Sequence, residues 1–160
     1  MERFQEARDK AKRNLQIADH MAYMTYSLVK DPRLLVVVME NLFLALTNAM
    51  SSVLHYERFF KRLEPFPENF EAKFTIFQNC AIKYSIDKSY LSMIRDIKEF
   101  IYEHKRSPME FTRKDRYVIC TDNYKMKAIS LDKIKRYILL TRNFLQITNS
   151  IVGKDEGILR

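Results

Sequence analysis

The sequence predicts an all-α protein, an antiparallel up-and-down bundle of about five helices with a small β-hairpin or long loop at about 109–129 before the last helix. Apolar residues recur at alternating spacings of four and three along most of the chain, which is the period of a helix face. The 160 residues include only two glycines and four prolines, so few positions interrupt a helix. Residues 109–129 differ, because β-favouring side chains and turn residues replace the helical period there.

The first helix is expected over residues 2–30. It has two apolar stripes, so we expect two of its faces to be buried. The first stripe comprises Phe4, Ala11, Leu15, Ala18, Ala22, Thr25 and Val29, and the second comprises Ile17, Met21, Met24 and Leu28. Asp31 is expected to cap the next helix, with Pro32 at its first position, where a missing N–H does no harm. A connection this short makes the first two helices an antiparallel hairpin.

The apolar run from Pro32 to Leu63 predicts a central helix against which the other helices pack. Its main seam comprises Leu35, Met39, Leu42, Leu46, Ala49, Val53, Tyr56 and Phe60. A helix that is apolar nearly all round lies in the interior of a protein or in a membrane. Glu40, Asn41 and Asn48 lie within this run, and a glutamate at mid-bilayer is costly. We therefore expect a core helix of a cytoplasmic protein that has no membrane partner.

The second half of the chain begins at a break with two prolines, residues 64–67, after which Asn69 or a neighbour starts a third helix. Residues 85–87 are expected to separate it from a fourth helix that ends near Lys105. Ser130 is expected to cap the last helix, and Gly153 to end it. These boundaries predict one domain over residues 1–152 and a flexible tail over 153–160.

The segment between the last two helices contains one strongly strand-like run, residues 117–120. The pairs Lys114-Asp115 and Asp122-Asn123 are turn candidates on either side of it. If the fourth and last helices are antiparallel neighbours, this segment protrudes from one end of the bundle as a flap.

No strong catalytic or metal-binding pattern is present in the sequence. Both glycines lie in the last eight residues, so there is no glycine-rich phosphate loop. The sequence contains no HExxH, no Glu-x-x-His and no paired-cysteine zinc spacing. The two lone cysteines, Cys80 and Cys120, are typical of a reducing compartment. We therefore expect neither a metal site nor a cofactor, and favour a non-enzymatic function.

Positive charge is concentrated in the last third of the chain. The formal net charge is +8, and residues 101–160 contribute an excess of six cations to it. Cations and aromatic residues alternate between Lys105 and Arg136, a segment that we name the basic pole. Its candidate binding residues are Lys105, Arg106, Arg113, Lys114, Arg116, Tyr117, Tyr124, Lys125 and Lys127.

The basic pole has more than one interpretation. Cations that meet phosphates, beside rings that stack on bases, are typical of single-stranded nucleic acid binding. Self-association or an acidic protein partner is the alternative, since four acidic residues dilute the charge. The aromatic residues could also serve to attach the flap to the bundle, and the charge could serve solubility alone.

The predicted order of helices resembles the HEPN-like bundles, many of which bind or act on RNA. Their ribonuclease members have an Arg and a His separated by four to six residues, and Arg13 and His20 are similar, with six residues between them. The resemblance implies an RNA-binding protein or a metal-independent ribonuclease, with Arg13 and His20 as candidate catalytic residues. The alternative is structural, with Arg13 solvated and His20 paired with Glu40 or facing water.

Self-association is expected through the hairpin of the first two helices. Both helices are apolar on more than one face, and the remaining helices can cover only part of that surface. A remaining apolar stripe can pair across a two-fold axis, so we expect a homodimer. The favoured function is therefore a non-enzymatic interaction module with a basic pole that binds an anionic partner.

Overall fold

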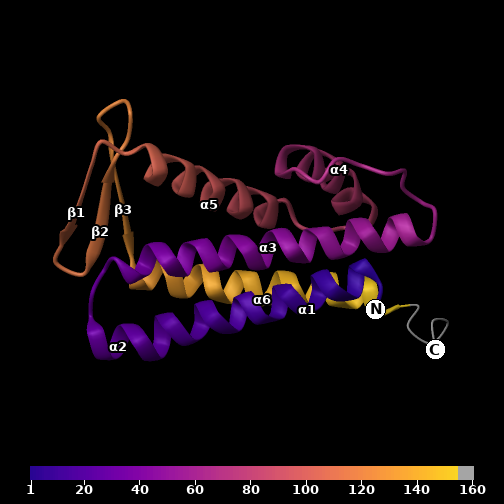
Figure 1. The fold of residues 1–160 in the computed structure, drawn as a ribbon, viewed down its shortest axis with the longest axis horizontal. Helices are drawn as coiled ribbons and strands as arrows, with labels where there is room; N and C mark the ends of the chain where they lie inside the picture. Colours follow the sequence, from indigo (N-terminus) through magenta and orange to yellow (C-terminus); the bar gives the residue numbers. More distant parts are fainter. Residues whose placement is uncertain (155–160) are drawn as a thin grey trace.

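The computed structural model describes residues 1–154, and it is mainly helical with one small antiparallel sheet (Figure 1). The helical segments are α1 (Arg3–His20), the π-helix η1 (Met21–Thr25), α2 (Tyr26–Val29), α3 (Leu34–Phe59), α4 (Phe70–Lys83), α5 (Lys88–Arg106) and α6 (Leu131–Gly153). The strands are β1 (Met109–Arg113), β2 (Arg116–Cys120) and β3 (Met126–Ser130). The mainly helical class and the order of the elements are confirmed. The tail expected beyond Gly153 lies, from residue 155 onward, outside the described residues.

The long helices lie side by side (Figure 1). Helices α1 and α3 form the expected hairpin, and α6 packs against both of them. Helices α4 and α5 lie on the opposite side of α3 from α1. The sheet lies at the end of the molecule where α5 ends and where α3 and α6 begin.

Helix α3 is the central helix that the apolar run predicted. Its seam is buried from Leu35 to Tyr56, and Phe60 at its C-terminal end is partly buried. By length and composition alone, α3 could also cross a membrane. The helices packed around it cover most of its apolar surface instead. Helix α3 ends at Phe59, four residues before the apolar run ends at Leu63, because Lys61 adopts a left-handed conformation (φ 58°).

The π-helix η1 interrupts the first helix, which the sequence did not predict. A π turn accommodates one extra residue, so the positions after it rotate relative to the core. Tyr26 is therefore buried where Thr25 was expected, and Val29 is exposed. The second expected stripe is also wrong as a buried face, because Ile17, Met24 and Leu28 are exposed.

Side-chain caps start the later helices at the expected places. The Asn69 side chain accepts a hydrogen bond from the Ala72 N–H, and the Ser130 hydroxyl accepts one from the Lys133 N–H. Asp87 caps α5 in the same way, by accepting from Ser89. Asp31 accepts from the backbone N–H of Arg33, but Pro32 and Arg33 form a turn, and α3 begins only at Leu34.

The segment before α6 is a three-stranded meander in the order β1-β2-β3, where a two-stranded hairpin or loop was expected. Phe111 pairs with Val118, and Val118 pairs in turn with Ala128. The turn candidates are confirmed, because Lys114 and Asp115 join β1 to β2, and the residues from Thr121 to Lys125 join β2 to β3. The Lys125 carbonyl accepts a 2.7 Å hydrogen bond from the Thr121 N–H and closes the second loop.

Candidate interaction surface on the sheet

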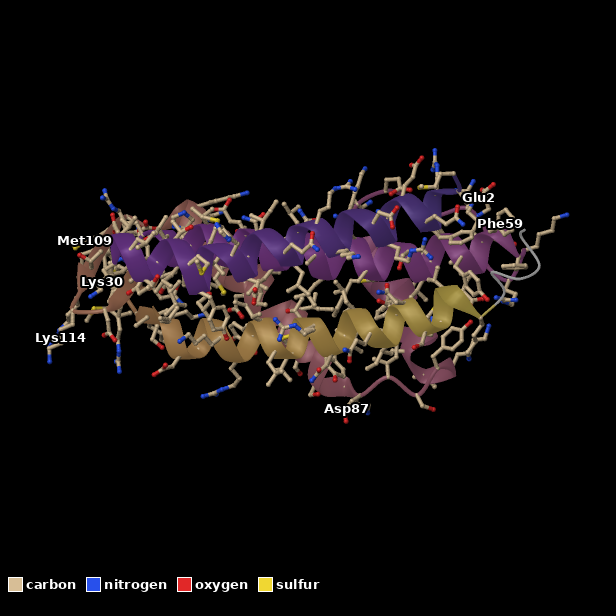
Figure 2. The ribbon with its side chains drawn as sticks, turned by 90° about the horizontal axis from the view of Figure 1, so that it is seen from below. Glu2, Lys30, Phe59, Asp87, Met109 and Lys114 are labelled. Atoms are coloured by element: carbon tan, nitrogen blue, oxygen red, sulfur yellow. The ribbon has the colours of Figure 1, made fainter. Side chains whose placement is uncertain are left out.

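The sheet protrudes at one end of the molecule, as the flap geometry predicted. Helix α5 ends and helix α6 begins at this end, so residues 109–130 are held there (Figure 1). Figure 2 shows Met109 and Lys114 at this end, beside Lys30, while Glu2 and Phe59 mark the opposite end. The helices therefore position the candidate surface at one end of the molecule, and segments that connect such elements frequently contain binding residues.

The two faces of the sheet differ in chemistry, because successive side chains of a strand point to opposite faces. One face packs on the helices through Tyr117, Ile119 and Ile129, which are buried in the core cluster. The register then places nine residues on the opposite face, which we name the outer face. They are Met109, Phe111, Arg113, Arg116, Val118, Cys120, Met126, Ala128 and Ser130.

The outer face is apolar with a cationic end. Met109 and Met126 are 62% and 67% exposed, and Phe111 is 36% exposed. Val118 on the middle strand is buried, although it does not belong to the main core cluster. Arg113 and Arg116 pair across the turn at one end of the face, and no acidic residue is among the nine.

A partly buried hydrogen-bond network attaches the sheet to α5. His104 Nδ1 lies 2.6 Å from Glu110 Oε1, and the Tyr117 hydroxyl donates to the other carboxylate oxygen. Burial, with Glu110 as the second cause, raises the pKa of Tyr117 to about 12. The ring of Tyr117 is thus an anchor of the sheet and lies on the helix-facing side, away from the outer face where a stacking residue was expected.

The candidate cations fall into two groups. Arg106 pairs with Asp122 at 3.1 Å, and Lys127 pairs with Glu103 at 2.5 Å and with Glu99 at 3.6 Å, so these two attach the sheet and its loop to α5. The second group is exposed, and within residues 1–154 no ion pair joins any of its members to a carboxylate. It comprises Lys105, Arg113, Lys114, Arg116 and Lys125.

Tyr124 lies in the loop between β2 and β3 and is 83% exposed. Its backbone is left-handed (φ 61°), and its N–H donates a 2.8 Å hydrogen bond to the Thr121 carbonyl. Tyr124 and Lys125 therefore lie beyond one end of the outer face, while Arg113 and Arg116 lie at the other. The sequence candidates did not include Met109, Phe111 or Met126, although alternation along the strands places all three on one face.

The two candidate catalytic residues of the HEPN-like resemblance, Arg13 and His20, lie on α1 and not on the sheet. Arg13 and His20 are both exposed on α1, and among residues 1–154 no ion pair joins His20 to Glu40. Within the same residues, no group of three or more His, Cys, Asp or Glu side chains is placed to hold a metal ion. No protein-family model matches this sequence, and a search of curated proteins returns no match either.

Proposed function

We propose that this chain is a non-enzymatic interaction module, an antiparallel up-and-down helical bundle of the cytoplasm that binds single-stranded nucleic acid on the outer face of its sheet. The observation that supports the proposal is the composition of that face. Exposed Phe111 and Tyr124 offer rings for stacking, and Arg113, Arg116 and Lys125 offer cations that form no ion pair with a carboxylate within residues 1–154. Stacking platforms beside cations are the usual means of binding single strands.

The dimensions of the sheet fit a short single strand. Each strand has five residues, which corresponds to about 17 Å at roughly 3.4 Å per residue. A nucleic acid that follows β1 would meet Tyr124 and Lys125 near one end and Arg113 and Arg116 at the other. The resemblance to HEPN-like bundles points to the same class of partner, with RNA as the nucleic acid.

The test compares two triple variants in a binding assay with a fluorescent single-stranded RNA. Arg113→Ala/Lys114→Ala/Arg116→Ala removes the cationic end of the outer face. Lys12→Ala/Lys61→Ala/Lys88→Ala removes the same charge from exposed sites outside the sheet. We expect the first variant to bind much more weakly. The slope of log affinity against log salt concentration should also become less steep by about two, because each phosphate contact with a single strand contributes about 0.7 to that slope.

The control variant should retain most of the affinity. Equal loss in both variants would show that binding follows net charge alone and would contradict a site on the sheet. Salt-independent binding, or no binding, would leave another protein or a second copy as the partner. Cleavage of the RNA that is lost in folded His20→Ala would replace the proposal by the ribonuclease alternative.

We also propose that the chain forms a homodimer through the α1/α3 hairpin. Ile17, Met24 and Leu28 are exposed along one side of the first helix, and Val37 and Leu44 are exposed on α3. Asn48 donates a 2.9 Å hydrogen bond to Asn14 across the two helices. Residues three or four apart lie on the same face of a helix. Ile17 lies three residues after Asn14, and Leu44 lies four residues before Asn48. Ile17 and Leu44 therefore lie on the side of the hairpin where this hydrogen bond is formed. A second copy would cover these side chains from water.

A further inference from the structure

A polar pocket of about 320 Å³ lies at the opposite end of the molecule from the sheet. It is formed by the first turns of α1, the C-terminal half of α3, the start of α4 and the loop that precedes α4. In Figure 2 this end is marked by Glu2 and Phe59, and Lys114 is at the far end. The polar and charged side chains that line it include those of Arg3, Lys10, Ser51, His55, Glu68 and Lys73.

Glu68 is the common partner of three groups in this pocket. Its Oε2 lies 2.5 Å from Lys73 Nζ, and its Oε1 lies 3.2 Å from His55 Nε2 and 3.8 Å from an Arg3 nitrogen. Lys73 also donates a 2.9 Å hydrogen bond to the Ser51 hydroxyl. Three basic side chains from three different elements therefore converge on the position of one carboxylate.

The cationic side chains that line the pocket outnumber its carboxylates, even with Glu68 included. Arg3, Lys10 and Lys73 are opposed by Glu68 and by Glu6, the second carboxylate in the lining. Lys10 is exposed, and within residues 1–154 no carboxylate forms an ion pair with it. Burial lowers the pKa of His55, and Lys73, Arg3 and Arg58 lower it further against the opposing effect of Glu68. The lowered pKa favours the neutral imidazole, whose Nε2 lies 3.2 Å from Glu68 Oε1.

We propose that this pocket binds a small molecule with a phosphate group, and that the Glu68 carboxylate occupies the position that the phosphate takes. The basic side chains around Glu68, those of Lys73, His55 and Arg3, are of the types that bind oxyanions in proteins. Glu68 is half exposed on a loop, so its ion pairs are weak and can exchange for a ligand with more charge. The pocket volume is at the lower end of the range for small-molecule sites.

The test measures binding of inorganic phosphate and pyrophosphate by calorimetry at constant ionic strength, with acetate as the reference anion. Glu68→Gln removes the competing charge, and we expect it to bind pyrophosphate about fivefold more tightly, the equivalent of roughly 1 kcal/mol. Lys73→Met should abolish the binding. Lys88→Met, an exposed lysine of α5 outside this pocket, is the matched control and should bind like the parent.

A second variant keeps the test decisive if Lys73→Met fails to fold. Lys10→Met removes an exposed cation of the pocket and should weaken binding with no change in thermal stability. Three results would each overturn the proposal: no saturation up to about 10 mM pyrophosphate, equal binding by the Lys73 or Lys10 variant and the parent, or weaker binding by folded Glu68→Gln. The triple variant of the sheet should leave pyrophosphate binding unchanged, so this test is independent of the nucleic-acid proposal.

Discussion

His55 is a buried histidine whose protonation opposes folding. Burial lowers its pKa, and the neighbouring cations Lys73, Arg3 and Arg58 add to that effect, while Glu68 opposes it. A group with a lower pKa in the folded state binds protons more tightly when unfolded. Its contribution to stability is therefore complete above the unfolded pKa of about 6.5 and is lost as the pH falls toward the folded pKa.

We expect thermal stability to fall between about pH 7 and pH 5, and His55→Gln to reduce this fall, because glutamine does not titrate. Melting curves followed by circular dichroism at several pH values measure the effect. His20→Gln, at an exposed position of α1, is the matched control and should show the slope of the parent. A slope that is identical in the parent and in His55→Gln would disprove this role of His55.

Thr141 has a buried hydroxyl that lacks a hydrogen-bond partner within residues 1–154. A buried polar group without a partner has lost its water and gained nothing in exchange. We expect Thr141→Val, which keeps the shape of the side chain, to raise the free energy of unfolding by about 1 kcal/mol. Urea denaturation measures the change.

The matched control is another fully buried threonine on the same helix. The Thr148 hydroxyl donates a 3.1 Å hydrogen bond to the Leu145 carbonyl. Thr148→Val loses that bond, so it should be neutral or destabilising. If both valine variants change stability equally, the missing partner of Thr141 has no energetic consequence.

Because the chain has few glycines, other residues adopt the left-handed conformation at several helix ends and turns. Positive φ, a conformation that glycine adopts without strain, occurs after helix ends at Lys30, Lys61 and Ser85 and in the turns of the sheet at Lys114 and Tyr124. At the end of α3, the Arg62 N–H bonds the Glu57 carbonyl and the Lys61 N–H bonds the Arg58 carbonyl, which is the Schellman pattern. The backbone therefore adopts the usual helix-ending geometry with a lysine in the strained position.

Lys61→Gly should therefore stabilise the protein. The left-handed conformation costs an L-residue about 1–2 kcal/mol, and glycine loses about 0.5–1 kcal/mol in extra chain entropy, so the net gain is about 0.5–1 kcal/mol. Lys61 is exposed, and Lys61→Ala keeps the strain while removing the same side chain. Chemical denaturation of both variants provides the comparison, and a glycine variant no more stable than the alanine variant would contradict the strain.

Most elements could be predicted from the sequence, because their signals are local. Asn69, Asp87 and Ser130 bond the first turn of their own helices, and such caps are visible as residue types. The π-helix η1 could not be predicted, since five residues are too few to separate its period from that of an α-helix. The third strand was missed because Met126 to Ser130 has weak β propensity, and its pairing with β2 determines its structure.

At the scale of the whole molecule, the candidate site could be predicted only in outline. The position of the flap followed from the ends of two helices, and its exposed cations followed from composition. The burial of Tyr117 and the partners of Arg106 and Lys127 depend on contacts between distant segments, which a single sequence does not specify. The outer face itself depends on strand register, which requires all three strands to be placed.

The exposed stripe on the hairpin makes a prediction about assembly. Leu28 is 83% exposed on α2, and Leu28→Glu would place a charge inside the proposed dimer interface. We expect the parent to be a dimer at micromolar concentration and Leu28→Glu to be a monomer, as measured by sedimentation velocity. Ile82→Glu changes an apolar residue of α4 that is 77% exposed, and this variant should remain a dimer. A parent that sediments as a monomer would refute the interface.

The central claim is that the outer face of the sheet binds single-stranded nucleic acid. The most direct measurement is a titration of isotope-labelled protein with a short single-stranded RNA, followed by amide shifts in NMR spectra. We expect saturable shifts that cluster at Met109, Phe111, Arg116, Tyr124 and Met126, with residues of the α1/α3 hairpin unchanged. Shifts that cluster around Arg13 and His20, or no saturable shifts at all, would contradict it.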